Sequence, residues 1–480
     1  MRKALNGITM YRLMLYYLLL LWGIGIVFAY SGIIPFDGTA ILLEGILFLS
    51  IARVTNFVLS RLLSVNANFE SSSITALILT LIVGPVQVSS NLIPLSVVAI
   101  IAMASKYLLV YKKKHIFNPA AFAALVGGLT ISIGPTWWVG LTPMLPFILI
   151  GGLLVLIKIQ RERMVLAYAL TVLLSSIFNG SLSPTVLSPA IWFFALVMLV
   201  EPLTSPHSIK GRIIFAALVG LVQILLYNIA PGFPFPLSAS LLLGNLFTAF
   251  ITPTYNLSME FSHKKQIAKN TWAFFFKPER KFNFKPGQYL EWTFAHFPFD
   301  SRGTRRFFTI ASSPTEKEVM IAIRVAKKGS SFKKRLLSIN RGQSLAASSP
   351  MGEFVLPTDN RVPLCFIAGG IGVTPFRSMV NHLLETGEKR DIVLLYSNHS
   401  KDEVAFEKLF DSAKSLGVKA IYVNTEKDGH LDEKRLKKLV PDYASRVFYL
   451  SGPKSLVDAF KRIIVGLGIK GIKTDFFPGY

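Results

Sequence analysis

The sequence predicts a polytopic α-helical membrane domain of about ten transmembrane helices, followed by a cytoplasmic antiparallel β-barrel and a doubly wound α/β domain. Three observations predict this. Hydrophobic residues make up 52% of the 480 residues and charged residues only 16%, which is too apolar for a wholly soluble protein. The apolar content is concentrated before about Met259, and short alternating segments with turn residues follow. A glycine-rich turn, 369–375, then joins an apolar run to an amphipathic stretch, as a strand-to-helix connection does.

These changes in composition give the domain limits. We expect the membrane domain at residues 1–257, a linker at 258–269, the β-barrel at 270–357 and the α/β domain at 358–480.

Charge and cysteine content restrict the function. Residues 1–262 carry a net charge of +8 and residues 263–480 of +16, together the total of +24. So basic a domain, tethered to a bilayer, is attracted to anionic lipid and to phosphate-bearing ligands. No basic stripe with interleaved aromatic residues indicates nucleic-acid binding. Cys365 is the single cysteine, which excludes a disulfide within the chain and a cysteine-ligated iron–sulfur cluster.

Ten apolar runs suit membrane spans. The first follows Arg2 and Lys3 and has no cleavage site behind it, so we expect an anchor helix and not a cleaved signal peptide. Several runs are short for a bilayer core of about 30 Å, which favours broken or tilted helices. The runs are 10–30, 39–62, 73–88, 92–111, 119–133, 138–159, 164–178, 186–200, 213–229 and 237–254.

The loops between these runs predict the topology. Lys and Arg occur in alternate connections, at Arg61, 112–114, Arg161, Lys210 and Lys264, and the intervening connections contain neither. By the positive-inside rule both termini and the second half are cytoplasmic, and the protein is a multi-pass protein of the cell (inner) membrane.

Four charged residues fall inside the predicted spans: Glu44, Arg53, Lys106 and Lys158. Such residues line a cavity or pair with a partner, and the alternative is an internal ion pair or an anchor at a helix end. We do not assign ion transport from them.

Two segments on the cytoplasmic side carry a resemblance: 115–121, which contains Asn118-Pro119, and 201–206, which begins Glu201-Pro202. With the ten-helix layout they resemble the NqrB/RnfD family, the membrane flavin proteins of sodium-translocating NADH:quinone reductases and of Rnf electron-transport complexes. That resemblance covers most of residues 1–257. It implies a flavin (FMN or riboflavin) in the membrane domain, with Asn118 near it.

The same resemblance points to Thr185. Family members attach FMN to a threonine in an outer loop, and 179–185 occupies the corresponding place here. Leu182 stands where the family has a serine, so Thr185 is either the flavin attachment site or an ordinary polar loop residue.

The predicted β-barrel contains two segments suited to a flavin. In 306–309, Arg306 and Phe308 share one face of a strand, so a guanidinium can bind a diphosphate while the ring packs on a flavin, with Thr309 near the flavin's reactive nitrogen. Downstream, 328–331 resembles a helix N-terminus with serine caps, another phosphate site.

With the glycine turn, 451–453 and the chain end, these segments resemble the ferredoxin-NADP reductase superfamily over essentially all of 263–480. Phe308 replaces the usual tyrosine, and Ser451 replaces the usual cysteine beside the nicotinamide. The resemblance implies FAD and NAD(P)H as cofactors, and Thr309, Ser451 and Asp475 as catalytic residues. It implies cofactor binding by Tyr289, Arg306, Phe307, Phe308, Thr309, Arg324, Gly329, Ser330, Ser331, Gly369, Gly370, Gly372, Thr374, Pro375, Ser397, Asn398, Ser451, Gly452, Pro453, Phe477 and Tyr480.

The choice of nucleotide depends on the segment beside the adenosine ribose. After the strand 392–396 come Ser397 to Lys401, with no acidic residue before Asp402. An acidic residue favours the ribose diol of NADH, so this pattern favours NADPH, and NADH stays open.

The leading hypothesis is a membrane-bound flavin oxidoreductase. Cytoplasmic NAD(P)H reduces FAD, and electrons pass to a membrane flavin, a quinone or an extracytoplasmic acceptor, with additional redox subunits as partners besides the lipid bilayer. A redox-coupled Na⁺/H⁺ transporter and a mere membrane anchor stay as alternatives. A haem-type reductase needs axial ligands, usually histidine, and no histidine lies in the middle of a predicted span, so no haem is expected.

Overall fold

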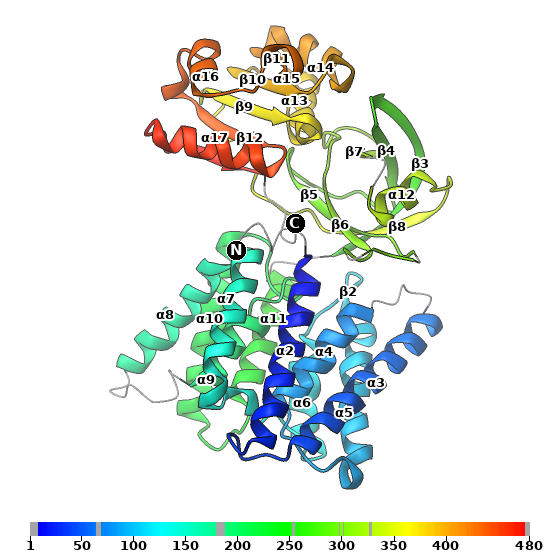
Figure 1. The fold of residues 1–480 in the computed structure, drawn as a ribbon, viewed down its shortest axis with the longest axis vertical. Coiled ribbons are helices and arrows are strands. Elements are labelled where there is room, and N and C mark those ends of the chain that lie inside the picture. The colour runs from blue at the N-terminus through cyan, green and yellow to red at the C-terminus, as the bar shows by residue number, and fades with distance from the viewer. Residues whose placement is uncertain are drawn as a thin grey trace. The chain divides into compact units, whose positions relative to one another are not determined.

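The protein forms two compact units that divide after Tyr255 (Figure 1). We call them the helical unit and the C-terminal unit. The computed structural model describes residues 8–63, 69–178, 188–251, 255–296, 298–300, 302–325 and 329–475.

The helical unit contains a helix in each of the ten predicted apolar runs. Helices one or two places apart in the chain pack side by side, with α3 against α4 and α5, and α10 against α8 and α11. The helices are α2 (Met10–Tyr30), α3 (Gly38–Leu62), α4 (Phe69–Ile82), α5 (Val88–Leu108), α6 (Pro119–Thr130), α7 (Leu145–Ile159), α8 (Glu162–Phe178), α9 (Pro189–Phe193), α10 (Ile209–Ile229) and α11 (Pro236–Ile251).

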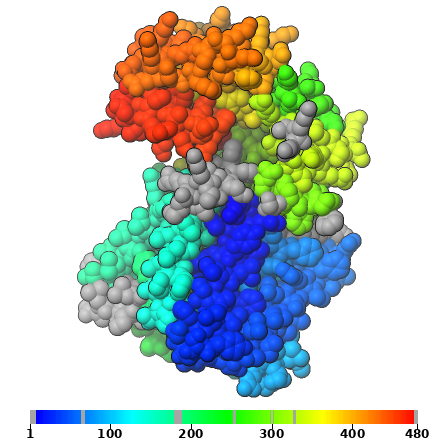
Figure 2. All heavy atoms as spheres, viewed as in Figure 1, coloured from blue at the N-terminus to red at the C-terminus, as the bar shows by residue number. Residues whose placement is uncertain are grey.

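Length and hydropathy place nine of these ten helices in two groups and α8 in neither. Among the described residues, five helical segments are long and apolar enough to cross a membrane, and four apolar helices of 10–17 residues are shorter. The predicted count of about ten spanning helices is therefore not confirmed. Among the residues that the structure describes, the exposed large hydrophobic side chains all belong to the helical unit, apart from Phe299 and Val465. α2, dark blue in Figure 2, forms part of that apolar surface. Such a surface suits lipid contact and supports a membrane location.

The expected breaks in the helices occur where their backbone groups find other partners. The helix α5 is kinked at Asn91, three residues before Pro94. The turn between α6 and α7 is held by the amides of Thr136 and Trp137, which both donate to the Ile82 carbonyl at 2.7 and 2.8 Å. Irregular backbone at membrane depth is stable only when it is satisfied by protein in this way.

Three of the four charged residues in the predicted spans bind polar groups outside their own helix. Glu44 accepts a hydrogen bond from the Val86 amide (3.2 Å), and Arg53 donates to the Ser73 hydroxyl (3.2 Å). Lys106 donates to the Ser71 carbonyl (3.0 Å), and Lys158 is buried. An internal ion pair or an anchor at a helix end stays the alternative prediction for these four residues.

The C-terminal unit begins with a six-stranded antiparallel sheet in the order β6-β5-β8-β3-β4-β7, with β6 and β7 close enough to curve it into a barrel. The residues predicted as a linker, 258–269, instead lie almost wholly in β3. That strand alternates buried and exposed residues early on and pairs with both β4 and β8, so it is a full member of the sheet. The strands are β3 (Asn256–Ala268), β4 (Thr271–Pro278), β5 (Tyr289–Thr293), β6 (Arg305–Thr309), β7 (Val319–Arg324) and β8 (Ser344–Ser348); α12 (Ser331–Leu337) follows β7.

The second part is a parallel sheet in the order β11-β10-β9-β12-β13, the order expected of a doubly wound domain. Its central strand β9 is completely buried, because helices cover both faces. The elements are β9 (Leu364–Gly369), α13 (Thr374–Thr386), β10 (Ile392–Asn398), α14 (Glu407–Ser412), β11 (Val418–Asn424), α15 (Thr425–Asp428), α16 (Glu433–Leu439), β12 (Val447–Ser451), α17 (Lys454–Gly466) and β13 (Ile472–Thr474).

Candidate functional site

Three side chains from distant parts of the C-terminal unit meet at one point. Thr309 ends β6, Ser451 ends β12, and Asp475 follows β13. The Ser451 hydroxyl donates to the Asp475 carboxylate at 3.1 Å, and the Thr309 hydroxyl lies 3.5 Å from the same oxygen. These are the three residues predicted as catalytic, and the fold brings all three together.

Asp475 has an unusual environment for a carboxyl group. Burial raises its pKa from 3.8 to about 7, although the hydrogen bonds from Ser451 and Thr309 lower it. Its other oxygen, Oδ1, is buried and has no hydrogen-bond partner among the described residues. A carboxyl that titrates near neutral pH and has unused hydrogen-bonding capacity is typical of a functional site.

The predicted flavin-binding strand has the expected alternation. Arg306 and Phe308 both contact the Phe332 ring, at 5.4 Å for the guanidinium carbon and 5.8 Å between ring centroids, so they share a face. Phe307 instead packs edge-on against Tyr289 of β5. Phe308 is half-buried and is therefore the aromatic ring of this strand with surface left for a ligand.

Arg306 is held by its own turn. Its guanidinium is 1% exposed, and Nη1 donates to the carbonyls of Arg302 (2.7 Å), Gly303 (3.1 Å) and Arg305 (2.6 Å). Nη2 donates to the Asp300 carboxylate at 3.2 Å. The predicted diphosphate contact of Arg306 therefore requires it to exchange at least one of these partners.

Asp300 also occupies the second predicted phosphate site. Ser330 caps α12 as expected, and the Ser331 amide donates to Asp300 at 2.9 Å. Although burial raises the pKa of Asp300, the amides of Ser331 and Arg302 and the charges of Arg302 and Arg306 hold it below the ordinary value, so the group is ionised. A broad cleft opens beside this cluster, lined by Gly329, Ser331, His296, Lys334 and Arg335.

The glycine turn is shaped mainly by packing. A Cβ at Gly369 would lie 2.8 Å from Pro453, and one at Gly372 would lie 2.4 Å from Gly452, so the turn and the segment 451–453 touch directly. Gly370 differs, because it has a φ of +52° and nothing within 4 Å of its Cβ position. Thr374 and Pro375 open α13. Gly370 is thus the position where a ligand can approach the backbone.

The other predicted nucleotide residues lie at the same edge. Ser397 pairs with Gly369 across the parallel strands, and Ser397 and Asn398 are buried at the end of β10. Ligands of doubly wound sheets bind at this carboxyl edge. Arg324 does not converge on it: its guanidinium pairs with Glu403, at 3.1 Å for Nη1. Phe477 and Tyr480 lie outside the described residues.

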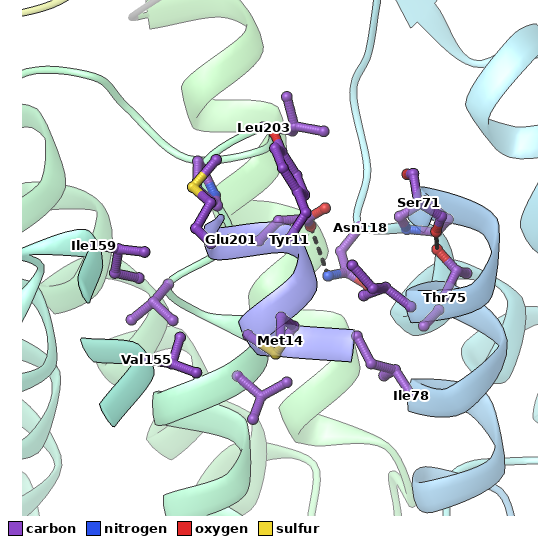
Figure 3. A pocket seen from close by; sticks show the side chains of 17 residues that line it. Tyr11, Met14, Ser71, Thr75, Ile78, Asn118, Val155, Ile159, Glu201 and Leu203 are labelled. Carbon is purple, nitrogen blue, oxygen red and sulfur yellow. Dashed lines mark hydrogen bonds between the residues drawn. The ribbon is translucent and has the colours of Figure 1, made fainter. Parts of the chain in front are cut away.

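The helical unit has its own pocket, lined by 17 residues and drawn in Figure 3. Tyr11 and Met14 of α2 form one wall, and Ile78, Val155 and Ile159 contribute apolar surface from neighbouring helices. The polar end contains Asn118 and Glu201, whose side chains are joined by a 2.8 Å hydrogen bond. The two segments singled out in the sequence therefore meet in one pocket.

The pocket is small in this conformation. Its volume is about 70 Å³. That is room for several waters, since one water needs about 10–15 Å³. A flavin or quinone ring enters only if the lining moves apart, for which the flexible Met10 and Met14 are suited. Thr185, the predicted attachment site, lies outside the described residues.

Sequence reasoning missed Asp300, Glu316 and Arg377. Asp300 is the acidic residue in a stretch otherwise rich in arginine, 300–306, and that contrast is a usable signal. Glu316 and Arg377 are 61 residues apart and bind each other, and no local pattern announces such a pair.

Two parts of the chain match known protein families. Residues 366–462 match the oxidoreductase NAD-binding domain, and residues 139–257 match the NQR2, RnfD, RnfE family. The predicted resemblance of both halves is confirmed. The matches cover the strand–glycine–helix region in one unit and α7 to α11 in the other.

Relatives of known name match only part of this chain. A flavohemoprotein of Burkholderia sp. (strain TH2) is 28% identical over 207 residues, 40% of this chain and 51% of that protein. A flavohemoprotein of Candida albicans is 32% identical over 42% of this chain and 52% of that protein. An NADPH oxidoreductase of Mycobacterium tuberculosis is 26% identical over 38% and 49%. This chain therefore spans about half the length of the curated relatives it matches.

Among solved structures, the FAD/NAD-binding domain of a nitric oxide dioxygenase from Vibrio cholerae is similar to 46% of this chain. The match covers 98% of that domain, with 18% identity and a TM-score of 0.41.

Proposed function

We propose that the protein is a membrane-bound NAD(P)H-dependent flavin oxidoreductase. In this proposal the C-terminal unit binds FAD and a reduced pyridine nucleotide, and the helical unit receives the electrons. The observation that carries it is the meeting of Thr309, Ser451 and Asp475, one from the barrel and two from the α/β domain, at the edge where the family match expects a nucleotide.

The residues present fit an FAD. Phe308 offers a half-buried ring next to Thr309, and the cleft beside α12 is lined by Lys334 and Arg335, which suit the charge of a diphosphate. Asp475 Oδ1 is a buried oxygen with unused capacity, which suits a donor on an incoming ligand. The cleft and the aromatic strand belong to one barrel, so one extended cofactor can contact both.

The residues of the site have distinct tasks in this proposal. FAD, when bound, accepts a hydride and can release its electrons one at a time. Thr309, whose hydroxyl is held among the described residues only by a long 3.5 Å contact with Asp475, would turn its hydrogen to the edge of a bound flavin. Ser451 fixes the Asp475 carboxylate in place through their 3.1 Å hydrogen bond. The ionised carboxylate stabilises the positive charge that develops on the nicotinamide as its hydride leaves.

The helical unit supplies the next site for the electrons. A hydrocarbon core of about 30 Å needs an intermediate acceptor between its faces. The pocket of Asn118 and Glu201 combines apolar walls with hydrogen-bonding groups at one end, which suits a flavin or a quinone. Thr185 remains the proposed attachment site of a covalently bound FMN. Both termini and the C-terminal unit are proposed to lie on the cytoplasmic side of the membrane.

Redox-coupled Na⁺ or H⁺ movement is the second candidate function. Glu44 favours it, because this residue is 1% exposed inside α3 and its Oε1 has no partner among the described residues. A buried carboxyl within a membrane helix is a candidate for carrying a proton or a cation. Sodium dependence of NAD(P)H oxidation in proteoliposomes, abolished by Glu44→Gln, supports this function, and an unchanged rate and membrane potential contradict it.

The main proposal is tested with purified full-length protein in detergent, reconstituted with FAD. NADH and NADPH are added separately without oxygen, and bleaching of the flavin absorbance is followed. Thr309→Ala, Ser451→Ala and Asp475→Ala should each slow the bleaching. A wild-type protein that binds no FAD, or whose flavin neither nucleotide reduces, contradicts the proposal. Release of a second flavin only by proteolysis would support attachment at Thr185.

A further inference from the structure

The barrel and the α/β domain are fastened together next to the candidate active site. The segment 311–316 continues the chain directly after β6 and Ile310, and α13 continues it directly after the glycine turn. The Ser378 hydroxyl on α13 donates to the Ser312 carbonyl at 2.6 Å, and the Arg377 guanidinium donates to the Ala311 carbonyl at 2.9 Å.

Glu316 forms the centre of this contact. Its carboxylate accepts both Nη groups of Arg377, with 2.9 Å between Nη2 and Oε1. It also accepts the Ser313 amide at 2.5 Å and the Asn381 side-chain amide at 3.0 Å. Paired Arg–carboxylate bonds of this kind fix orientation as well as distance. Arg377 is only 11% exposed, so water screens the pair little.

An aromatic contact adds to the Arg377–Glu316 interaction. Phe406, from the α/β domain, packs against the barrel residues Ala311 and Met320, and its ring lies 5.7 Å from the Arg377 guanidinium carbon. A second ion pair, Arg324–Glu403, also joins the two domains, but Arg324 is 43% exposed. The two ion pairs thus join the same domains, and they differ in the exposure of the arginine, 11% for Arg377 and 43% for Arg324.

We propose that Arg377 and Glu316 are positioning residues, which hold the nicotinamide-binding turn at a fixed distance from the flavin-binding strand. This inference rests on the proposed function. Arg377 is three positions beyond Thr374 at the start of α13, and Ala311 is two positions beyond Thr309. A displacement of Arg377 relative to Ala311 therefore moves both sides of the reaction centre. Hydride transfer requires the reacting atoms within about 3–3.5 Å, and a shift of about 1 Å costs roughly 100-fold in rate.

The experiment compares Arg377→Ala with Glu403→Ala in the full-length protein. Each variant breaks one ion pair between the same two domains, so Glu403→Ala is a matched control. FAD content, the nucleotide dissociation constant, the single-turnover rate of flavin reduction and the long-wavelength charge-transfer absorbance of the stacked flavin and nicotinamide are measured. Arg377→Ala should keep FAD and nucleotide affinity within about twofold, reduce flavin about 10- to 100-fold more slowly and lose the charge-transfer band. Glu403→Ala should change the rate less than about twofold.

The outcomes separate this inference from the proposed function. A wild-type flavin that NAD(P)H does not bleach overturns the proposed function itself. A functional wild type with an Arg377→Ala variant that reduces flavin within twofold of it overturns only the positioning role. If Arg377→Ala loses FAD, Glu316→Gln decides, since it keeps the shape and one acceptor oxygen while removing the charge. A Glu316→Gln rate equal to wild type, with FAD bound, contradicts the inference.

Discussion

Asp475 is the side chain whose charge matters most at the residue scale. Its pKa of about 7 means that the carboxyl changes from neutral to ionised across physiological pH. The ionised form opposes the positive charge that the nicotinamide gains, so flavin reduction should accelerate as pH rises from 6 to 8. In Asp475→Asn the reaction should be slower and nearly independent of pH over that range. Stopped-flow bleaching with saturating nucleotide measures both.

Protein stability gives an independent test of the raised Asp475 pKa, because stability should fall with rising pH while the rate of flavin reduction rises. The pKa of Asp475 is higher in the folded protein than the ordinary 3.8, so its contribution to stability is complete below about pH 4 and is lost as pH rises through 7. Asp475→Asn should therefore gain thermal stability relative to wild type at pH 8 more than at pH 5. If Asp475→Asn keeps the wild-type dependence of the rate on pH, Asp475 has no role in the reaction.

Asp300 is expected to compete with the cofactor. Its ionised carboxylate already accepts hydrogen bonds from Arg306 and the Ser331 amide, the two groups predicted to bind the FAD diphosphate. Asp300→Asn removes a negative charge from that place and should tighten FAD binding by about tenfold, the factor that about 1.4 kcal/mol gives. Titration of the flavin-free protein, followed by flavin fluorescence, measures the dissociation constant.

The control for this change is Asp359→Asn. Asp359 pairs with Arg361 at the surface, where both side chains are largely exposed, so the substitution changes net charge equally without touching the cluster. Its FAD affinity should equal that of wild type. Weaker FAD binding by Asp300→Asn would mean that Asp300 orients Arg306 for the cofactor instead of competing with it.

The sequence predicts a residue's role where that role depends on its neighbours in the chain or on a family motif. Ser330 was predicted as a helix cap from the serines that precede the helical stretch, and it caps α12. Thr309, Ser451 and Asp475 were predicted as catalytic residues from the family resemblance. Arg324 stays a predicted cofactor-binding residue, although its guanidinium pairs with Glu403, because an exposed arginine at a strand end is equally suited to a phosphate or to a carboxylate. Only the fold brings Glu403, 79 residues later, beside it.

At the scale of elements, the sequence pattern predicted whether a segment is a helix or a strand better than it predicted where the segment begins and ends. The alternation after Asn256 already belongs to β3, but the charged residues around Lys264 resembled a linker. In the membrane half, hydropathy located each helix correctly. It did not separate full spans from shorter helices such as α4 and α6, because a short helix followed by an apolar turn has the same average hydropathy as a continuous one.

One arginine ties three strands of the α/β sheet. Arg446, just before β12, is 6% exposed and donates to the Leu364 carbonyl at the start of β9 (3.0 Å), to Asp391 just before β10 (2.9 Å) and to Asp442 (2.9 Å). Arg446→Ala leaves a buried carbonyl and two carboxylates without their partner. Because both carboxylates are half exposed, we expect a loss of about 1–3 kcal/mol, below the usual 3–5 for a fully buried pair.

Urea unfolding of the FAD-loaded protein, followed by far-ultraviolet circular dichroism, measures that loss. Arg361→Ala is the comparison, because its ion pair with Asp359 is exposed and should contribute little to stability. Equal midpoints for the two variants would contradict a structural role for Arg446. Flavin reduction by folded Arg446→Ala should match wild type, since the residue lies at the amino ends of the strands, away from Ser451.

At the scale of the whole molecule, the chain divides after Tyr255, and in the proposed function this division separates nucleotide oxidation from acceptor reduction. The C-terminal unit contains the complete barrel, the complete parallel sheet and all three candidate catalytic residues, so residues 256–480 should fold alone. We expect this fragment to bind FAD and to reduce ferricyanide with NAD(P)H within about twofold of the full-length rate. Ferricyanide takes electrons directly from an exposed flavin, so it does not need the helices.

The membrane acceptor should behave differently. In native membranes or liposomes with quinone, the fragment should reduce the acceptor far more slowly than the full-length protein, because the pocket of Asn118 and Glu201 is missing. Full-length Asn118→Ala should keep the ferricyanide rate and lose the quinone rate, which separates the pocket from mere anchoring. A fragment that reduces quinone at the full rate would show that the helices only tether the reductase, and the electron-accepting role of the helical unit would then be wrong.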